Sequence, residues 1–126
     1  MSAAQVRAYA AKAQEFAEAA TSDLDAGRNI AATSLAIHAG INSADAVCGA
    51  RLGKRAAGED HDQVLALLRQ AGPDGVEVER ELRRLLPLKT KAEYEPDDLA
   101  PSVAAKAVER AQRCAAAARR VADKTR

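Results

Sequence analysis

Apolar residues recur at steps of three and four along most of this chain, the spacing that places them on one face of an α-helix. The first stretch predicts a helix over Ala3–Asp25, closed by Gly27 as a C-terminal cap. A second stretch predicts a helix over Asn29–Arg55, stopped by Gly58. The apolar positions are Val6, Tyr9, Ala13, Phe16, Ala20 and Leu24 in the first helix, and Ile30, Ile37, Ile41, Ala44, Cys48 and Leu52 in the second.

The middle of the chain predicts two shorter helices separated by a loop. Asp60 can cap a short helix with its side-chain oxygen, which places His61 at the first helical position. The Gly-Pro-Asp-Gly segment at Gly72–Gly75 predicts a loop, and a further helix is predicted over Val76–Leu86. The residues expected to face inward are Val64, Leu65, Leu67 and Leu68 in the short helix, and Val78, Leu82, Leu85 and Leu86 in the next.

The last third of the chain predicts one more long helix. Pro87 lacks an amide hydrogen and should kink or end the preceding helix, while Leu88–Tyr94 could form a separate turn. A final helix is predicted over Ser102–Lys124, with Ala104, Ala107, Ala111, Cys114, Ala118 and Val121 along its apolar seam. No segment predicts a strand. We therefore expect a single all-α domain over residues 1–126, an up-and-down bundle of four long helices plus one short helix.

Composition supports this fold and limits the functions it can carry. Alanine, the strongest helix former, dominates the apolar residues, which make up 48% of the chain. Only three aromatic residues, Tyr9, Phe16 and Tyr94, are present, too few to stack successive nucleic-acid bases. The formal net charge is +1, so the chain as a whole lacks the basic character of an obligate nucleic-acid-binding domain. Any phosphate binding must therefore come from local segregation of charge.

The cysteines and the absence of long apolar runs bear on location. Cys48 and Cys114 lie in different predicted helices and do not form a Cys-x-x-Cys motif, so we expect no disulfide framework and no metal site. The first residues lack an apolar signal core, and no run approaches the roughly 20 apolar residues needed to span a bilayer. We expect a cytoplasmic protein with no membrane contact and no cofactor.

Two groups of polar residues beside the second helix could carry chemistry. His38, Asn42 and Asp45 form a polar stripe beside the apolar seam, which is either a network between helices or a half-exposed edge. Arg55 precedes His61, with five residues between them. His61 could act as an acid–base group beside Arg55, because histidine titrates near neutrality. The alternative is a structural histidine whose ring packs in the loop between the helices.

The last helix carries a row of cations on the face opposite its alanine seam. This basic row consists of Lys106, Arg110, Arg113, Arg120 and Lys124. Such a row could follow a phosphate backbone, with each contact releasing counterions. The alternative is a solvated helix face on which Glu109 and Asp123 offset the positive charge.

Two segments of the chain, Ser34–His61 and Leu88–Tyr94, resemble parts of HEPN domains, which are small helical bundles linked to nucleotidyltransferases and RNA-cleaving toxins. The resemblance extends over about Ala31–Val121. It rests on a small-residue second helix, the loop that leads into Asp60 and His61, and an alanine-rich last helix. The resemblance implies a homodimer that associates with RNA or nucleotides. It also implies a nucleotidyltransferase-type protein partner, as in a toxin–antitoxin or defence pair.

Catalytic members of this family are metal-independent endoribonucleases that use an arginine followed four to six residues later by a histidine. No histidine follows Arg83 and Arg84, where the motif would align, and this departure argues against ribonuclease activity. Lys89 and Lys91 occupy that region instead, and the candidates for nucleic-acid binding are these two residues together with Lys106, Arg110, Arg113 and Arg120 of the basic row.

A displaced match to the catalytic motif remains between the second and third predicted helices. Arg55 and His61 have the required spacing, although they lie on either side of the predicted break at Gly58. By resemblance, these two residues are the catalytic candidates, and Asp45 is a supporting polar residue on the second helix.

A different class of function is also compatible with the sequence. The low net charge and interspersed acids fit a structural protein–protein interaction module. Its small-residue seam could receive a helix from another protein, which would require exposed alanine and isoleucine on the second helix. RNA binding should weaken steeply with rising salt, whereas association through an apolar seam should persist.

Overall fold

A computed structural model describes residues 1–56 and 60–126 of the chain. The described residues are all-helical and include no strand, which confirms the predicted fold class. The helices are α1 (Ala3–Asp25), α2 (Asn29–Leu52), α3 (His61–Arg69), α4 (Gly72–Leu85), α5 (Lys89–Tyr94) and α6 (Pro101–Asp123), with a 3₁₀ turn, η1 (Leu86–Leu88), between α4 and α5. None of these described helices combines the length and apolar character that crossing a bilayer requires.

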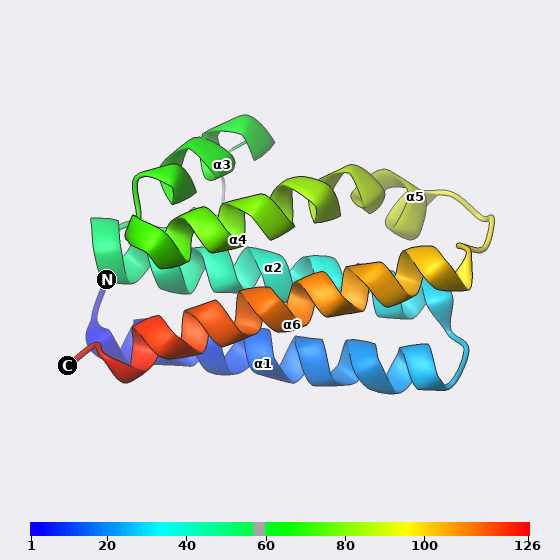
Figure 1. The fold of residues 1–126 in the computed structure, drawn as a ribbon, viewed down its shortest axis with the longest axis horizontal. Coiled ribbons are helices and arrows are strands. Elements are labelled where there is room, and N and C mark those ends of the chain that lie inside the picture. The colour runs from blue at the N-terminus through cyan, green and yellow to red at the C-terminus, as the bar shows by residue number, and fades with distance from the viewer. Residues whose placement is uncertain (57–59) are drawn as a thin grey trace.

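Helix α2 lies at the centre of the molecule (Figure 1). It packs against α1, α4 and α6 and also contacts α3 and α5, and 15 of its 24 residues are buried. The predicted apolar stripe covered only one face of this helix, but the structure encloses most of its circumference. Small side chains allow this close approach: a Cβ atom at Gly40 would lie 2.9 Å from Leu82 Cδ1.

Several elements meet at the end of the molecule that holds both termini (Figure 1). The Met1 ammonium lies 3.4 Å from the Gly53 carbonyl oxygen, and Arg7 Nη1 donates to the Thr125 carbonyl at 3.2 Å. The first turn of α1 therefore lies beside the last residues of α2 and α6. Arg120 on α6 pairs with Asp74 in the first turn of α4, so α4 begins at this end too.

Glycines end the first two helices, and one boundary differs from the prediction. Helix α1 ends at Asp25 as predicted, and Gly27 adopts a left-handed φ of +77°. Helix α2 ends at Leu52 rather than at Arg55, because Gly53 adopts a φ of +73° and donates its amide to the Gly49 carbonyl. The left-handed conformation favours glycine and stops an α-helix. The predicted break at Gly58 lies outside the described residues.

The predicted start of α3 is confirmed in detail. The Gln63 amide donates to Asp60 Oδ1 at 2.8 Å, and the Asp60 amide donates to Gln63 Oε1 at 3.0 Å. This reciprocal capping box satisfies two amides at the start of the helix. Leu65 and Leu68 are buried, while Val64 and Leu67 are partly buried against the core.

The predicted loop at Gly72–Gly75 is wrong: these residues form the first turn of α4. Proline fits that position because the amide it lacks would have had no partner within the helix. Gly75 is buried where α4 meets the end of α3, and a Cβ atom there would lie 2.3 Å from the Leu68 carbonyl oxygen. The glycine therefore serves a close helix contact rather than a turn. The four residues predicted to face inward from this helix are buried.

Pro87 ends α4 as predicted, and the chain continues through η1 into the separate short helix α5. Helix α6 begins and ends one residue earlier than predicted, with Pro101 at its first position. All six residues of its predicted apolar seam are buried.

Candidate functional site

Asp45 and Arg55, two of the predicted catalytic residues, lie together near the end of α2. Arg55 Nη2 is 3.2 Å from Asp45 Oδ2, and the Ala56 amide donates to Asp45 Oδ1 at 3.0 Å. Asp45 is 1% exposed, whereas the Arg55 side chain is about half exposed. The buried carboxylate therefore fixes the backbone that follows α2.

The Arg55 guanidinium also stacks on α1. Its Cζ atom lies 4.9 Å from the centroid of the Tyr9 ring, a cation–π arrangement. One face of the guanidinium is thus engaged by an aromatic ring and one edge by Asp45. Through these two contacts, Arg55 links α1 to α2 and to the segment that follows α2.

His61, the third predicted catalytic residue, is exposed at the first position of α3. Within the described part of the chain, its side chain makes no hydrogen bond or ion pair. The structural alternative, a ring packed in the loop between the helices, involves residues 57–59, which lie outside the described residues. The structure joins Asp45 to Arg55 but does not bond His61 to either residue.

The polar stripe of α2 does not form one network. Asn42 donates to the His38 carbonyl of its own helix at 2.8 Å, while Asp45 faces Arg55. The His38 ring lies 5.4 Å from the Phe16 ring, and its Nε2 is 3.6 Å from Glu93 Oε1 on α5. The three side chains therefore have different partners: a carbonyl of α2 for Asn42, Arg55 for Asp45, and groups on α1 and α5 for His38.

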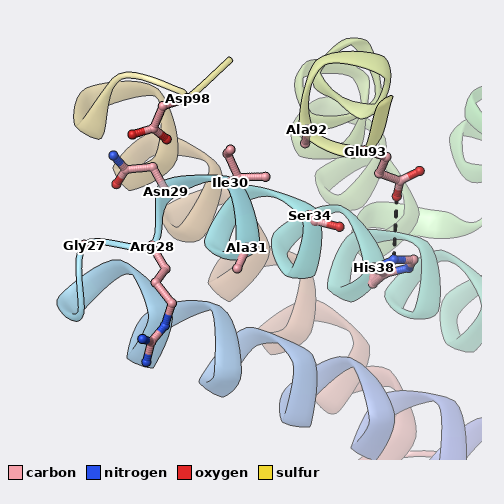
Figure 2. A pocket seen from close by; sticks show the side chains of 10 residues that line it. All are labelled: Gly27, Arg28, Asn29, Ile30, Ala31, Ser34, His38, Ala92, Glu93 and Asp98. Atoms are coloured by element: carbon pink, nitrogen blue, oxygen red, sulfur yellow. Dashed lines mark ion pairs between the residues drawn. The ribbon is translucent and has the colours of Figure 1, made fainter. Parts of the chain in front are cut away.

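His38 and Glu93 lie at one edge of a pocket of about 940 Å³ between the first half of α2 and α5 (Figure 2). Glu93 and Asp98 contribute carboxylates to its wall. Arg28 extends toward α1, away from those carboxylates, and pairs with Asp23 at 3.1 Å. A pocket with two carboxylates and an arginine turned aside is a poor receptor for phosphate.

All three arginines of the basic row are paired with carboxylates of α4. Arg110 and Arg113 each lie 3.4 Å from Glu81 Oε2. Arg120 lies 3.2 Å from Asp74 Oδ1 and also contacts Glu77. Counter-charges for this row therefore come from the neighbouring helix α4, and no ion pair in the described chain involves the expected Glu109 or Asp123.

A second pocket, of about 630 Å³, lies where α4 and η1 meet α6. We call it the basic groove, and its lining residues are Arg83, Arg84, Pro87, Leu88, Val103, Lys106, Ala107 and Arg110. Four of these side chains are cationic, and none of the described lining residues is acidic. The groove is therefore the place where positive charge gathers.

The four cations of the groove differ in their internal partners. Arg110 pairs with Glu81 at 3.4 Å, and Arg83 lies 3.8 Å from Glu79. Arg84 and Lys106 are exposed and make no ion pair within the described residues. Both carboxylates are buried, so the arginines are the more accessible members of these pairs.

The structure divides the six residues predicted to bind nucleic acid. Lys106 and Arg110 line the groove, whereas Arg113 and Arg120 lie farther along α6 beside carboxylates. Lys89 and Lys91 lie on α5 and are not among the groove's lining residues.

Other reactive groups do not form a site. Among the described residues, no cluster of histidine, cysteine and carboxylate side chains could hold a metal ion. Burial, and secondarily Asp45, raises the pKa of the Cys48 thiol to about 11. Burial also raises the pKa of Cys114, with Glu81 and Glu77 adding to the effect and Arg110 and Arg113 opposing it. Both thiols are thus kept protonated and inaccessible.

Arg83 and Arg84 were missed as binding residues from the sequence. Their adjacency in the last turn before Pro87 was the available signal, but the sequence pattern was interpreted only as a catalytic motif that lacks its histidine. Their proximity to Lys106 depends on how α4 packs against α6. No protein-family model and no curated protein matches this chain.

Proposed function

We propose that this protein is a HEPN-like up-and-down helical bundle that binds RNA or a nucleotide through phosphate at the basic groove. The observation that supports this proposal is the convergence of Arg83, Arg84, Lys106 and Arg110 around one pocket without an acidic lining residue among those described. Arginine and lysine donors suit phosphate oxygens, and charge-assisted hydrogen bonds are stronger than neutral ones.

The proposed role is binding rather than cleavage. Neither histidine lines the groove, and the displaced pair of Arg55 and His61 is not joined by a hydrogen bond. Arg55 already has Asp45 and Tyr9 as partners. By its resemblance to HEPN domains, we propose that the protein forms a homodimer and acts with a nucleotidyltransferase-type partner in a toxin–antitoxin or defence pair.

A module that receives another protein's helix on the α2 seam has less support. That reading required exposed alanine and isoleucine along α2. The seam is instead covered by α1, α4 and α6, and Ala36, Ile37 and Ala44 are fully buried. The described part of α2 thus offers no open apolar face for a partner helix.

The proposal is tested by the binding of a fluorescently labelled single-stranded RNA, measured by anisotropy at several salt concentrations. We expect wild-type binding to weaken steeply with salt, because each phosphate contact releases counterions. The double variant Arg84→Gln/Lys106→Gln should bind at least about tenfold more weakly, since it loses two charge-assisted contacts.

The control removes one arginine and one lysine outside the groove, Arg80 on α4 and Lys124 directly after α6. Arg80→Gln/Lys124→Gln changes two exposed residues that make no ion pair within the described chain. Its affinity should stay close to that of the wild type. Equal losses in both double variants would show a diffuse charge effect, and absence of wild-type binding to both this RNA and ATP would refute the proposal.

Cleavage is tested separately with end-labelled RNA and no added metal. We expect no cleavage by the wild type. Cleavage that disappears in both Arg55→Ala and His61→Ala would instead establish a ribonuclease that uses the displaced pair, and would move the site away from the groove.

A further inference from the structure

We infer that the basic groove receives a short chain of consecutive phosphates, as found in a nucleoside triphosphate or at a triphosphate end of RNA, rather than a length of nucleic-acid backbone. This inference rests on the proposed function and specifies its ligand. It follows from where the positive charge of the basic row ends, from what lines the groove and from where the aromatic residues lie.

Carboxylates of α4 limit the surface that a polyanion could follow. Beyond the groove, Arg113 faces Glu81, and Arg120 faces both Asp74 and Glu77. A phosphate backbone that continued along α6 from Arg110 would approach Glu77 and Asp74, which remain partly exposed. Repulsion between like charges opposes that path, so favourable contact with phosphate is confined to the groove.

Positive charge is concentrated within the groove itself. Arg84 and Lys106 have no carboxylate partner among the described residues, and Arg83 lies 3.8 Å from Glu79. Glu79 Oε1 lies closer to Arg69 Nη2, at 3.3 Å, than to Arg83, so the Arg83 donors remain available to an anion. Several cations around one pocket of about 630 Å³ match a compact ligand with several adjacent negative charges.

The N-terminal end of α6 adds to the positive potential at the groove. Val103 lies at the third position of α6, and no side chain caps the start of this 23-residue helix. Amides at a helix start carry partial positive charge and favour a nearby anion. This contribution supplements the four cationic side chains.

The groove offers no means of reading a base. Its remaining lining residues are Pro87, Leu88, Val103 and Ala107, none of them aromatic. Tyr9 and Phe16 contact Arg55 and His38 elsewhere in the molecule. Without a stacking surface, the number of phosphates rather than the identity of the base should determine affinity.

The test measures binding of AMP, ADP, ATP, GTP and inorganic tripolyphosphate by isothermal titration calorimetry in metal-free buffer. We expect affinity to rise roughly tenfold with each added phosphate, because each adds charge-assisted contacts. ATP, GTP and tripolyphosphate should agree within about threefold. Arg84→Gln/Lys106→Gln should lose this dependence while Arg80→Gln/Lys124→Gln retains it, with thermal melting used to confirm that both variants are folded.

A second arm compares a short RNA that carries a 5′-triphosphate with the same RNA that carries a 5′-hydroxyl. Tighter binding of the triphosphate end identifies RNA ends as a ligand, and equal binding of free ATP identifies nucleotides as another. Equal affinity of AMP and ATP, or affinity for 5′-hydroxyl RNA that grows with length, would overturn this inference and leave the proposed function intact. If neither RNA nor polyphosphate binds, both proposals fail.

Discussion

At the scale of single residues, Asp45 shows how one buried charge can organise a segment that has no regular structure. Its carboxylate is 1% exposed and accepts hydrogen bonds from Arg55 and from the Ala56 amide. A buried carboxylate is tolerated only when such partners replace water. The same geometry explains why Arg55 lies against α1 and α2.

We expect Asp45→Ala to lower the free energy of unfolding by about 2–4 kcal/mol, because it removes an ion pair and leaves a buried amide without its acceptor. Chemical denaturation measures this change. Asp25→Ala, on the exposed end of α1, should change stability by less than about 0.5 kcal/mol. If Asp45→Ala were as stable as the wild type, the carboxylate would have a role other than holding this segment.

Gly75 and Gly40 illustrate two kinds of close contact. A Cβ atom at Gly75 would meet the Leu68 carbonyl at 2.3 Å, whereas one at Gly40 would meet the ends of Leu82 and Leu85 at 2.9 and 3.1 Å. Backbone atoms cannot move aside as easily as the tips of leucine side chains.

Gly75→Ala should therefore lower the free energy of unfolding by about 2–3 kcal/mol, the upper part of the range for overpacked cores. Gly40→Ala should cost about 1 kcal/mol or less, since rotation of the leucines and the better helix propensity of alanine offset the clash. Thermal or urea denaturation of the two variants checks the order. A larger loss for Gly40→Ala would contradict the packing described for α4 against α3.

At the scale of elements, α4 and α6 are joined by a seam of ion pairs that was not predicted. Glu81 is 6% exposed and lies between Arg110 and Arg113, while Asp74 and Glu77 meet Arg120 nearer the chain termini. The seam neutralises most of the basic row and leaves the groove as its positive end. One helix thus supplies both the counter-charges and two of the groove's own cations.

The two sides of this seam should respond differently to mutation. Glu81→Ala should lower the free energy of unfolding by about 2–3 kcal/mol, because it leaves Arg110 partly buried without a counter-charge. Arg113→Ala should cost less than about 1 kcal/mol, since the Arg113 side chain is 54% exposed and surface ion pairs contribute little. Urea denaturation of the two variants at low and high salt measures both changes in the free energy of unfolding. Equal losses would mean that the pair with Arg113 accounts for the whole contribution of Glu81.

At the scale of the whole molecule, the net charge of +1 conceals a marked separation of charge. Carboxylates lie along α4 where it faces α6, and the cations of the basic groove gather where the last turn of α4 meets α6. The core is formed mainly by small residues, and α2 contacts every other helix, so its packing depends on the whole bundle. Such an arrangement should unfold as one cooperative unit.

The two cysteines test this cooperativity, because Cys48 on α2 and Cys114 on α6 are fully buried. At pH 8 a thiol reagent should not modify either cysteine while the protein stays folded. When the reaction requires global unfolding, both thiols should be modified at the same rate. The pKa of Cys48, raised to about 11, adds pH dependence: little thiolate should form in the native protein until the pH approaches that value. Mass spectrometry of the labelled peptides gives both rates, and faster labelling of Cys48 would reveal a local opening of α2.

The sequence by itself determined the helices, because their periodicity, caps and end signals act over a few neighbouring residues. The all-α class, the limits of α1, the cap of α3 by Asp60 and the buried seam of α6 were all predicted. The end of α2 and the start of α4 were not predicted correctly, because glycine and proline can each occur in a loop, at a helix start or at a helix end. Only packing shows that Gly75 serves a helix contact and Gly53 a helix end.

The tertiary structure alone decided which charges meet. Lys106 and Arg110 were predicted as binding residues from one helix, but Arg83 and Arg84 join them only because α4 lies beside α6. Likewise, Asp45 acquires Arg55 because the chain turns back after Gly53, and Arg113 and Arg120 acquire α4 carboxylates. Electrostatic interaction depends on distance in space, which local sequence patterns do not encode. The sequence therefore specified the elements, and their packing determined where phosphate could bind.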